Sequence, residues 1–276
     1  MKPTDDNPSG RSPKPLVTVP CRFPEDVKRS AAVVRPQCHC FNKAGETAKG
    51  VEVTFHADEQ DTECAGWRRI LQLIDEAAAD GRTEFAPRRD MTDDEWAELV
   101  TLPPSVAKLK SVKRLMLYGS HLVRIPPEIG EMSALEEFVP YTSSRLHWFP
   151  YEITRCTNLK ESTVSTRCLY GNYKYRPPFP RLAPDRVSTN GLMLDRLPPQ
   201  TWGCDSAESC SVCGQPLNES GLHQVWISLR VATDVLPLLV NACSEVCIRN
   251  LPAPPQNYVT APHKGGRDLK QPPATY

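Results

Sequence analysis

The chain has 276 residues, a length that suits one or two domains. It carries 33 lysine and arginine residues against 33 aspartate and glutamate residues, and this balance excludes the strong overall field that draws a protein to nucleic acid or to an acidic membrane surface. Its apolar runs are all shorter than a bilayer span, so we expect no membrane partner.

The N-terminal residues 1–30 are polar and contain several prolines, and we interpret them as a disordered arm. The first segment, MKPTDDNPSGRSPKP, lacks the apolar stretch that a secretory signal needs. The chain nevertheless contains 11 cysteines. Cysteines without a secretory signal favour reduced thiols and metal binding over disulfides, so we expect a cytoplasmic location.

Residues 31–101 are expected to form an N-terminal α/β capping region. Residues 50–56 alternate apolar and polar side chains, which is the period of a strand. Asp61 and Thr62 then predict the start of a helix whose apolar residues recur at spacings of three and four, and Gly81 predicts its end. Such an element could cover the exposed edge of the segment that follows.

Four cysteines of the N-terminal part form one group of candidate metal ligands: Cys21, Cys38, Cys40 and Cys64. One residue separates Cys38 from Cys40, whereas a zinc knuckle normally leaves two residues between its thiols. Scattered thiols in a reducing compartment are the alternative interpretation of this group, and we favour it over a second metal site.

The clearest local pattern is a predicted helix start. Thr92 and Glu95 have the spacing of a capping box, in which each side chain accepts a hydrogen bond from the other residue's backbone N–H. Met91 and Trp96 occupy the two positions of a hydrophobic staple. The short helix must end before Pro103, and the helix dipole explains the acidic residues of its first turn better than catalysis does.

Residues 102–171 contain about three copies of one pattern. An apolar residue followed by proline recurs every 23 to 24 residues, at Leu102-Pro103, Ile125-Pro126 and Phe149-Pro150. Apolar residues also match four, seven and ten positions after each start, namely Val106, Ile129 and Ile153, then Leu109, Met132 and Cys156, then Val112, Leu135 and Leu159. The pattern resembles the short, proline-containing leucine-rich repeats of intracellular signalling and adaptor proteins.

The resemblance implies an α+β fold: a short leucine-rich-repeat solenoid with an N-terminal helical cap, plus a small zinc-stabilised module. Each unit would set a short strand beside that of its neighbour and bury alternate residues in a shared core. The match weakens along the chain, where four residues replace core leucines: Phe138, Pro140, Ser162 and Val164. Pro140 predicts a bulge or a broken strand pairing. A proline-punctuated α/β segment with chance spacing is the alternative.

The resemblance also implies a face for binding a protein partner, because repeat proteins use the outward side of their strands in this way. The outward residues would be Arg114, Met116, Tyr118, Glu137, Val139, Tyr141, Glu161, Thr163 and Ser165. This face could instead be solvated, or covered by other segments of the same chain.

Residues 172–200 are interpreted as a C-terminal cap and linker. Aromatic residues alternate here with Lys174 and Arg176, and such a stretch can stack on bases and neutralise phosphates. The same residues could equally lie across the end of the repeats. The balanced overall charge favours the cap.

Residues 201–252 contain the strongest candidate site. The run Cys-Ser-Val-Cys-Gly at 210–214 has the spacing of a zinc knuckle, and its glycine suits the positive φ of a tight turn. Cys243 and Cys247 are spaced to share one helix face, and a predicted strand lies between the two pairs. This order resembles a treble-clef-like zinc finger, although three residues rather than two separate the second pair.

Four thiolates would leave no open position on the metal, so the predicted ion is a structural zinc. Its predicted ligands are Cys210, Cys213, Cys243 and Cys247. An alternative set replaces one of these by Cys204 or His223. Reduced cysteines without a metal are the remaining alternative.

Residues 253–276 form a proline-rich tail that could pack back on the chain or recruit a partner. Together these features predict a non-enzymatic, intracellular scaffold or adaptor that binds a protein of unknown identity. A zinc-dependent nucleic-acid-binding regulator is the first alternative, which the balanced charge disfavours. The second is a cysteine-dependent enzyme acting through Cys204, for which the sequence shows no accompanying base.

Overall fold

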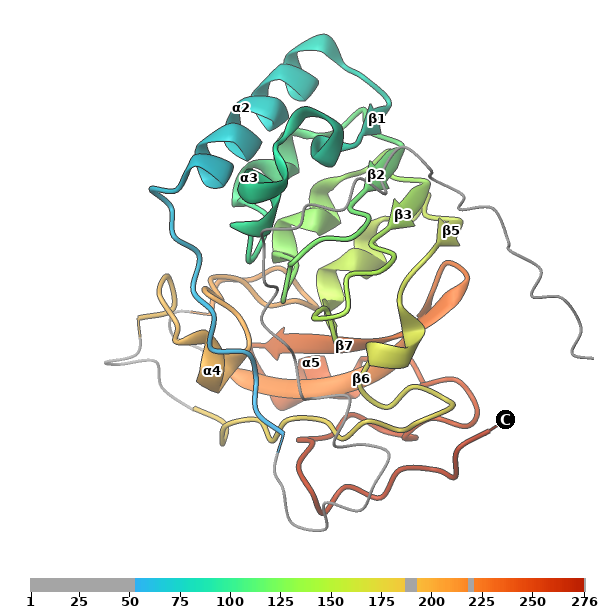
Figure 1. The fold of residues 1–276 in the computed structure, drawn as a ribbon. Helices are drawn as coiled ribbons and strands as arrows, with labels where there is room; N and C mark the ends of the chain where they lie inside the picture. Colours follow the sequence, from blue (N-terminus) through green and yellow to red (C-terminus); the bar gives the residue numbers. More distant parts are fainter. Residues whose placement is uncertain (1–52, 187–192, 218–220, 276) are drawn as a thin grey trace, which may run out of the picture. The chain divides into compact units, whose positions relative to one another are not determined.

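The computed structural model describes residues 53–186, 193–217 and 221–275, all within the unit Ala32–Tyr276. In these residues there are four α-helices, one wholly parallel sheet and one mixed sheet, so the predicted α+β class is confirmed (Figure 1). None of the described helices combines the length and the apolar character that crossing a membrane requires.

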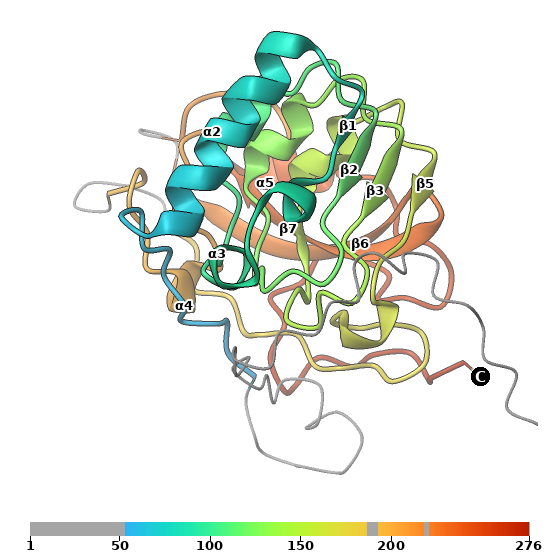
Figure 2. The ribbon, with the colours of Figure 1, turned by 45° about the horizontal axis from the view of Figure 1, so that its top comes forward.

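Three of the four strands in the parallel sheet pair at positions that lie 23 to 24 residues apart in the sequence. Its strands, in spatial order, are β1 (Glu84–Phe85), β2 (Arg114–Met116), β3 (Glu137–Val139) and β5 (Glu161–Ser162). Arg114 lies opposite Glu137, and Glu137 lies opposite Glu161. Figure 2 shows the four strands side by side and pointing in the same direction. Equivalent positions of the three sequence copies are therefore neighbours in space.

Pro140 ends strand β3 but does not break its pairing with β2. The Leu117 N–H donates to the Val139 carbonyl (2.9 Å), and the Gly119 N–H donates to the Tyr141 carbonyl (2.8 Å). Residues of the loop after β2 supply the donors here, so the missing N–H of proline is not needed on this side. The predicted bulge or break is therefore wrong on the side of β3 that faces β2.

A row of short 3-10 helices follows the same period as the strands. These helices are η3 (Pro104–Lys108), η4 (Pro127–Glu131) and η5 (Tyr151–Arg155). Each begins directly after a proline, whose fixed φ suits the first turn of a helix. Helix α2 (Ala65–Asp80) contacts η3, and the 3-10 helices contact one another in chain order. Each of the three 3-10 helices buries one apolar residue completely, and these residues are Val106, Ile129 and Ile153.

Helix α2 begins three residues later than the sequence predicts. Its N-cap is Cys64, whose sulfur accepts a hydrogen bond from the Trp67 N–H (3.3 Å). The Asp61 carboxylate accepts instead from the Glu63 N–H (2.8 Å) in a local turn, which removes it from the capping role. The predicted end is confirmed, because Gly81 adopts a φ of 67° as the C-cap.

The predicted capping box is confirmed at helix α3 (Asp93–Ala97). The Glu95 N–H donates to the Thr92 hydroxyl (3.2 Å), and the Thr92 N–H donates to the Glu95 carboxylate (2.7 Å). Met91 and Trp96, the two residues of the predicted staple, are both buried. This local sequence therefore determines where α3 begins.

The predicted strand at residues 50–56 is not a strand where the structure describes it. Val53 and Phe55 are buried and Thr54 is exposed, as the alternation predicts, but residues 53–56 have no described sheet partner. Phe55 packs its ring against Trp226, with 5.5 Å between the ring centroids. Burial against aromatic side chains, rather than a ladder of backbone hydrogen bonds, explains the pattern. Residues 50–52 lie outside the described part of the chain.

The mixed sheet connects residues 102–171 to residues 201–252, which contain the four predicted zinc ligands. Its order is β4 (Phe149–Pro150), β7 (Asp234–Ala242) and β6 (His223–Val231). Strand β4 runs parallel to β7, with Phe149 opposite Leu238, and β6 and β7 form an antiparallel hairpin. Phe138, Phe149 and Leu238 belong to one hydrophobic cluster. The ranges 102–171 and 201–252 therefore share both a sheet and a core.

The turn of the β6–β7 hairpin covers the free edge of the parallel sheet. The Ser162 N–H in the edge strand β5 donates to the Thr233 hydroxyl (3.1 Å), and this hydroxyl donates to the Ser162 carbonyl (2.9 Å). An unpaired sheet edge is a template for association with other chains. One threonine side chain thus satisfies a backbone donor and a backbone acceptor at this edge.

Replacing Thr233 by valine is expected to lower the free energy of unfolding by about 1–3 kcal/mol, because both backbone groups of Ser162 lose their partner. Urea unfolding followed by circular dichroism measures the change. The Thr233→Ser variant keeps the hydroxyl and should lose less than half as much. Equal stability of the valine variant and the parent protein would show that the edge is not held in this way.

The C-terminal tail packs against the second sheet. Trp226 and His263 exchange two backbone hydrogen bonds (2.8 and 3.0 Å), and the Gly266 N–H donates to the Phe179 carbonyl (2.9 Å). Burial lowers the pKa of His263 to about 4, so this imidazole is neutral at physiological pH. The tail is predicted either to pack back on the chain or to recruit a partner. Its described part packs against the chain.

Two further short helices flank the cysteine-rich segment. Helix α4 (Pro199–Trp202) precedes it and ends at Gly203, which has a φ of 75°. A side chain at Gly203 would meet the ring of Phe55 at 2.6 Å, so this position requires glycine for both its conformation and its packing. Helix α5 (Glu245–Arg249) follows directly after β7.

Candidate functional site

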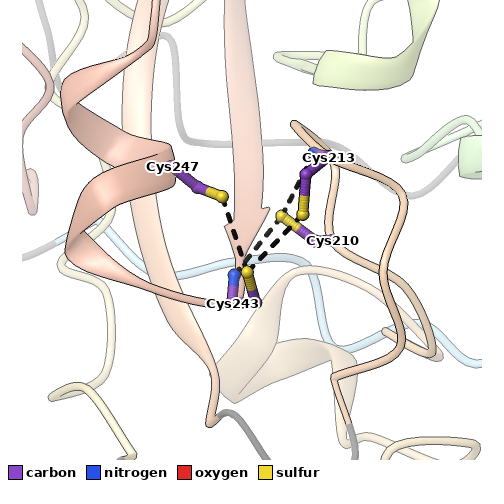
Figure 3. A group of neighbouring side chains, drawn as sticks. All are labelled: Cys210, Cys213, Cys243 and Cys247. Carbon is purple, nitrogen blue, oxygen red and sulfur yellow. Dashed lines mark hydrogen bonds between the residues drawn. The ribbon is translucent and has the colours of Figure 1, made fainter.

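Four cysteines from three local elements meet at one point (Figure 3). Cys210 and Cys213 lie in a turn, Cys243 follows the end of β7, and Cys247 lies in α5. One sulfur from each residue lies within 4.8 Å of the other three. The structure thus brings together all four cysteines that the sequence predicts as ligands.

The turn that carries the first pair is built by short backbone contacts. The Gly214 N–H donates to the Cys210 carbonyl (2.9 Å), and the Cys213 N–H points to the Cys210 sulfur (3.5 Å). Gly214 has a φ of 73°, which confirms the predicted reason for glycine at this position. Amide groups directed at a sulfur stabilise its thiolate form.

The second pair reaches the site differently from the prediction. Cys243 and Cys247 do not share a helix face, because α5 begins only at Glu245. Ser244 is the N-cap of this helix, and its hydroxyl accepts from the Cys247 N–H (3.4 Å). The strand end therefore directs Cys243 and the first helical turn directs Cys247. The preference of serine for N-cap positions explains why the helix does not extend back to Cys243.

Residues outside the cysteine segment hold the turn in place. The Arg155 guanidinium of η5 donates to the Ser211 carbonyl (2.9 Å) and to the Cys210 carbonyl (3.4 Å). Ser211 in turn exchanges hydrogen bonds with the backbone of Asn241 in β7 (2.7 and 2.9 Å). Arg155 is not predictable from the sequence, since it lies 55 residues from Cys210 and no spacing rule connects them.

The ionisation of the four thiols is uneven. A hydrogen bond from the Gln215 backbone lowers the pKa of Cys213 to about 7, while burial and the neighbouring thiols raise the pKa of Cys247 to about 12. Burial also raises the pKa of Cys243. Thiolates this close repel one another, so they ionise together only when a cation lies between them.

The distances between the sulfurs suit metal coordination. The Sγ atoms of Cys213 and Cys243 are 3.6 Å apart, and those of Cys243 and Cys247 are 3.5 Å apart. A tetrahedral ion with bonds of about 2.3 Å to sulfur separates its ligands by about 3.8 Å. A disulfide would instead bring two sulfurs to about 2.05 Å. The donor set and its spacing therefore fit a group that could hold a metal ion.

The two alternative ligands lie outside this group. The Nδ1 atom of His223 lies 3.6 Å from the Asp185 carboxylate and 3.8 Å from that of Glu245, so its closest charged neighbours are acidic. Cys204 is buried, and burial together with Asp205 raises the pKa of its thiol to about 12. This thiol is protonated at neutral pH and lacks the activation that a cysteine nucleophile needs.

The predicted second metal group is described only at Cys64. This residue acts as the N-cap of α2, and burial raises the pKa of its thiol. Burial favours the neutral thiol over the thiolate that a metal binds, and it outweighs the hydrogen bond from the Trp67 N–H, which acts in the opposite direction. The other three cysteines of the group, Cys21, Cys38 and Cys40, lie outside the described residues.

The predicted interaction face is only partly accessible. Its residues lie on the strands and on the loops after them, but Met116 and Val139 are only 5% and 1% exposed, so their predicted exposure is wrong. Strand alternation determines the side on which a residue lies, and does not decide whether another part of the chain covers that side. Arg114, Glu161 and Tyr141 are exposed, and the remaining members are partly buried: Tyr118, Glu137, Thr163 and Ser165.

Charge pairs and two neighbouring tyrosine rings organise the accessible part of this face. The Arg114 guanidinium lies 2.7 Å from the Glu137 carboxylate and 2.8 Å from that of Glu84. The rings of Tyr118 and Tyr141 lie 6.1 Å apart, and Tyr141 is 45% exposed. The face therefore offers an aromatic pair beside a partly neutralised row of charges.

Arg176 of the basic and aromatic stretch at 173–181 is engaged within the chain. The Arg176 guanidinium donates to the Gly171 and Pro273 carbonyls (2.9 and 3.2 Å) and lies 5.1 Å from the centre of the Tyr258 ring. Burial lowers the pKa of this group. These contacts favour a structural role for Arg176 over phosphate binding.

No protein-family model matches this chain, and no curated protein matches it.

Proposed function

We propose that the chain is a non-enzymatic protein-interaction module, in which a short leucine-rich-repeat array presents its strand face to a protein partner. A structural zinc ion on Cys210, Cys213, Cys243 and Cys247 closes the C-terminal end of this array. The observation that carries the proposal is the parallel, in-register pairing of positions 23 to 24 residues apart. That spacing lies in the range of leucine-rich repeats.

The covered ends of the array support this assignment. A repeat stack needs capping at both ends, because its terminal units would otherwise expose their cores. Helix α2 contacts η3, and strand β1 pairs with β2 at the N-terminal end of the array. At the other end, Thr233 of the β6–β7 hairpin bonds to Ser162 of the edge strand. A stack with both ends covered is consistent with a complete binding surface.

The zinc ion has a structural role in this proposal. Four sulfur ligands leave no coordination position for water, which a catalytic zinc requires. Arg155 links the ligand turn to the third 3-10 helix, so binding of the ion stabilises the packing of that turn against the array. Zinc is favoured over calcium or magnesium because thiolates are soft ligands and the latter ions prefer oxygen.

Photo-crosslinking from Tyr141 tests the binding face. With a benzophenone amino acid at this position, we expect one discrete covalent adduct from extracts of the source cells. The same amino acid at Val246, which is 55% exposed on α5, provides the matched control and should not give this adduct. Excess parent protein should suppress the adduct, whereas excess Tyr141→Ala protein should not. Equal adducts from both positions would assign the contact to another surface.

A further inference from the structure

A cavity of about 590 Å³ lies beside the loops that lead into η3 and η4. Its apolar walls come from distant parts of the chain: Trp67, Leu102, Ile125, Trp148 and Leu197. Ligand sites in proteins have this size and this largely apolar lining, with a few polar groups that determine specificity. None of the residues of the predicted interaction face lines the cavity, so this is a separate site.

The buried cation of the cavity is already satisfied. Arg124 is only 3% exposed, and its Nε and Nη2 atoms donate to the two Asp205 carboxylate oxygens at 2.6 and 2.7 Å. Its Nη1 atom donates to the Asp58 carbonyl (2.8 Å). A guanidinium paired in this bidentate way shapes the wall and offers no positive charge to an anionic ligand.

A carboxylate of the cavity is, in contrast, available for a cation. Glu128 lines the cavity from η4 and is partly buried. It has no ion pair among the described residues, and its carboxyl accepts a hydrogen bond from its own backbone N–H. Burial raises the pKa of its carboxyl, and the Glu208 and Glu131 carboxylates act in the same direction. A partly buried charge without a cation beside it costs stability, and such groups concentrate at functional sites.

The charge of the whole lining is negative. The carboxylates of Glu59, Glu128, Asp195 and Asp205 face two guanidinium groups, those of Arg124 and Arg196, which leaves an excess of two negative charges. Two of the apolar walls are the indole rings of Trp67 and Trp148. Indole rings attract cations through their π-electrons and also cover aliphatic chains.

We propose that this cavity binds a lysine or arginine side chain presented by an extended segment of a protein partner. The cation pairs with the Glu128 carboxylate, and the aliphatic stem lies along the apolar walls. The volume exceeds that of one side chain, so residues on either side of the basic residue also enter. Proline-rich walls suit such a segment, because Pro126 and Pro127 carry no N–H that burial would leave without a partner.

Isothermal titration with three capped pentapeptides tests this proposal. The first has the sequence proline–alanine–lysine–alanine–proline, and norleucine or glutamate replaces lysine in the other two. We expect the lysine peptide to bind the full chain about tenfold more tightly than the norleucine peptide, because only lysine forms the charged hydrogen bond. The glutamate peptide should bind most weakly of the three.

Two variants of η4 provide the matched comparison. Glu128→Gln should remove most of the preference for lysine over norleucine, and Glu131→Gln should keep it, since Glu131 pairs with Lys110 and does not line the cavity. The melting temperature of Glu128→Gln should equal or exceed that of the parent, because the change removes a partly buried charge. Equal binding of the lysine and norleucine peptides, or equal effects of the two variants, would overturn the proposal. A failure of binding by all three peptides at millimolar concentration would overturn it too, and would leave the strand-face function untouched.

Discussion

Replacing Cys247 by serine is expected to remove one zinc ion per chain and to lower the stability of the protein by about 5 kcal/mol or more, because the free energy of binding a structural zinc ion contributes directly to folding. For a chain of this size the melting temperature should fall by about 10 °C or more. Elemental analysis of the purified protein and calorimetry measure the two effects. Cys247 is buried and contacts Cys243 at 3.5 Å, so the first turn of α5 loses its contact with the ligand turn.

The control for this prediction is a cysteine outside the cluster. Cys64→Ser should retain the full zinc content and the full stability, because Cys64 caps α2 and serine is a better N-cap than most residues. A zinc chelator should lower the melting temperature of the parent and of this control, and should leave the Cys247→Ser variant unchanged. Zinc content that is zero in the parent protein, or unaltered in Cys247→Ser, would contradict the proposed metal site.

Replacing Phe138 by alanine is expected to lower the free energy of unfolding by about 3–5 kcal/mol, the usual cost of removing a buried aromatic ring. Phe138 is fully buried in β3, and its ring packs edge-on against Phe149 with 5.8 Å between centroids. Phe149 lies in β4, which pairs with β7 of the other sheet. The ring therefore supports the contact between the parallel sheet and the mixed sheet. Denaturant unfolding measures the loss.

Two variants separate this packing effect from a general effect of mutation. Phe138→Leu places at this position the residue that the repeat pattern predicts, and should cost about 1–2 kcal/mol because most of the volume is retained. Tyr141→Ala, two residues beyond β3 and exposed, should change stability by less than about 0.5 kcal/mol. If both sheets share one core, Phe138→Ala unfolds in a single transition. Two separate transitions would instead indicate that the two sheets fold independently.

Features that depend on residues close in the sequence were predictable. The capping box of Thr92 and Glu95 needs only one helical turn, and the tight turn after Cys213 needs only the freedom of Gly214 to adopt positive φ. The 23 to 24 residue period aligned Arg114, Glu137 and Glu161, which are neighbours across the parallel sheet. A period identifies neighbours because each unit of a repeat contacts the next one along the chain.

Features that depend on contacts between distant segments required the structure. The burial of Met116 and Val139, the support that Arg155 gives to the cysteine turn, and the use of Thr233 to cover the edge of β5 are of this kind. Strand period and residue type determine the side that a residue occupies, whereas the packing of other segments determines what covers it.

The cysteine cluster and the cavity show the same division. The spacing of the cysteines predicted the four sulfurs that meet, with Cys204 and His223 as alternatives, but only the tertiary structure showed that Cys243 lies before helix α5. The cavity has no sequence pattern, because its walls come from residues as far apart as Trp67 and Leu197. Local conformational preferences and nearest-neighbour stacking act over a few residues or one repeat, and a cavity forms only where long-range packing leaves space.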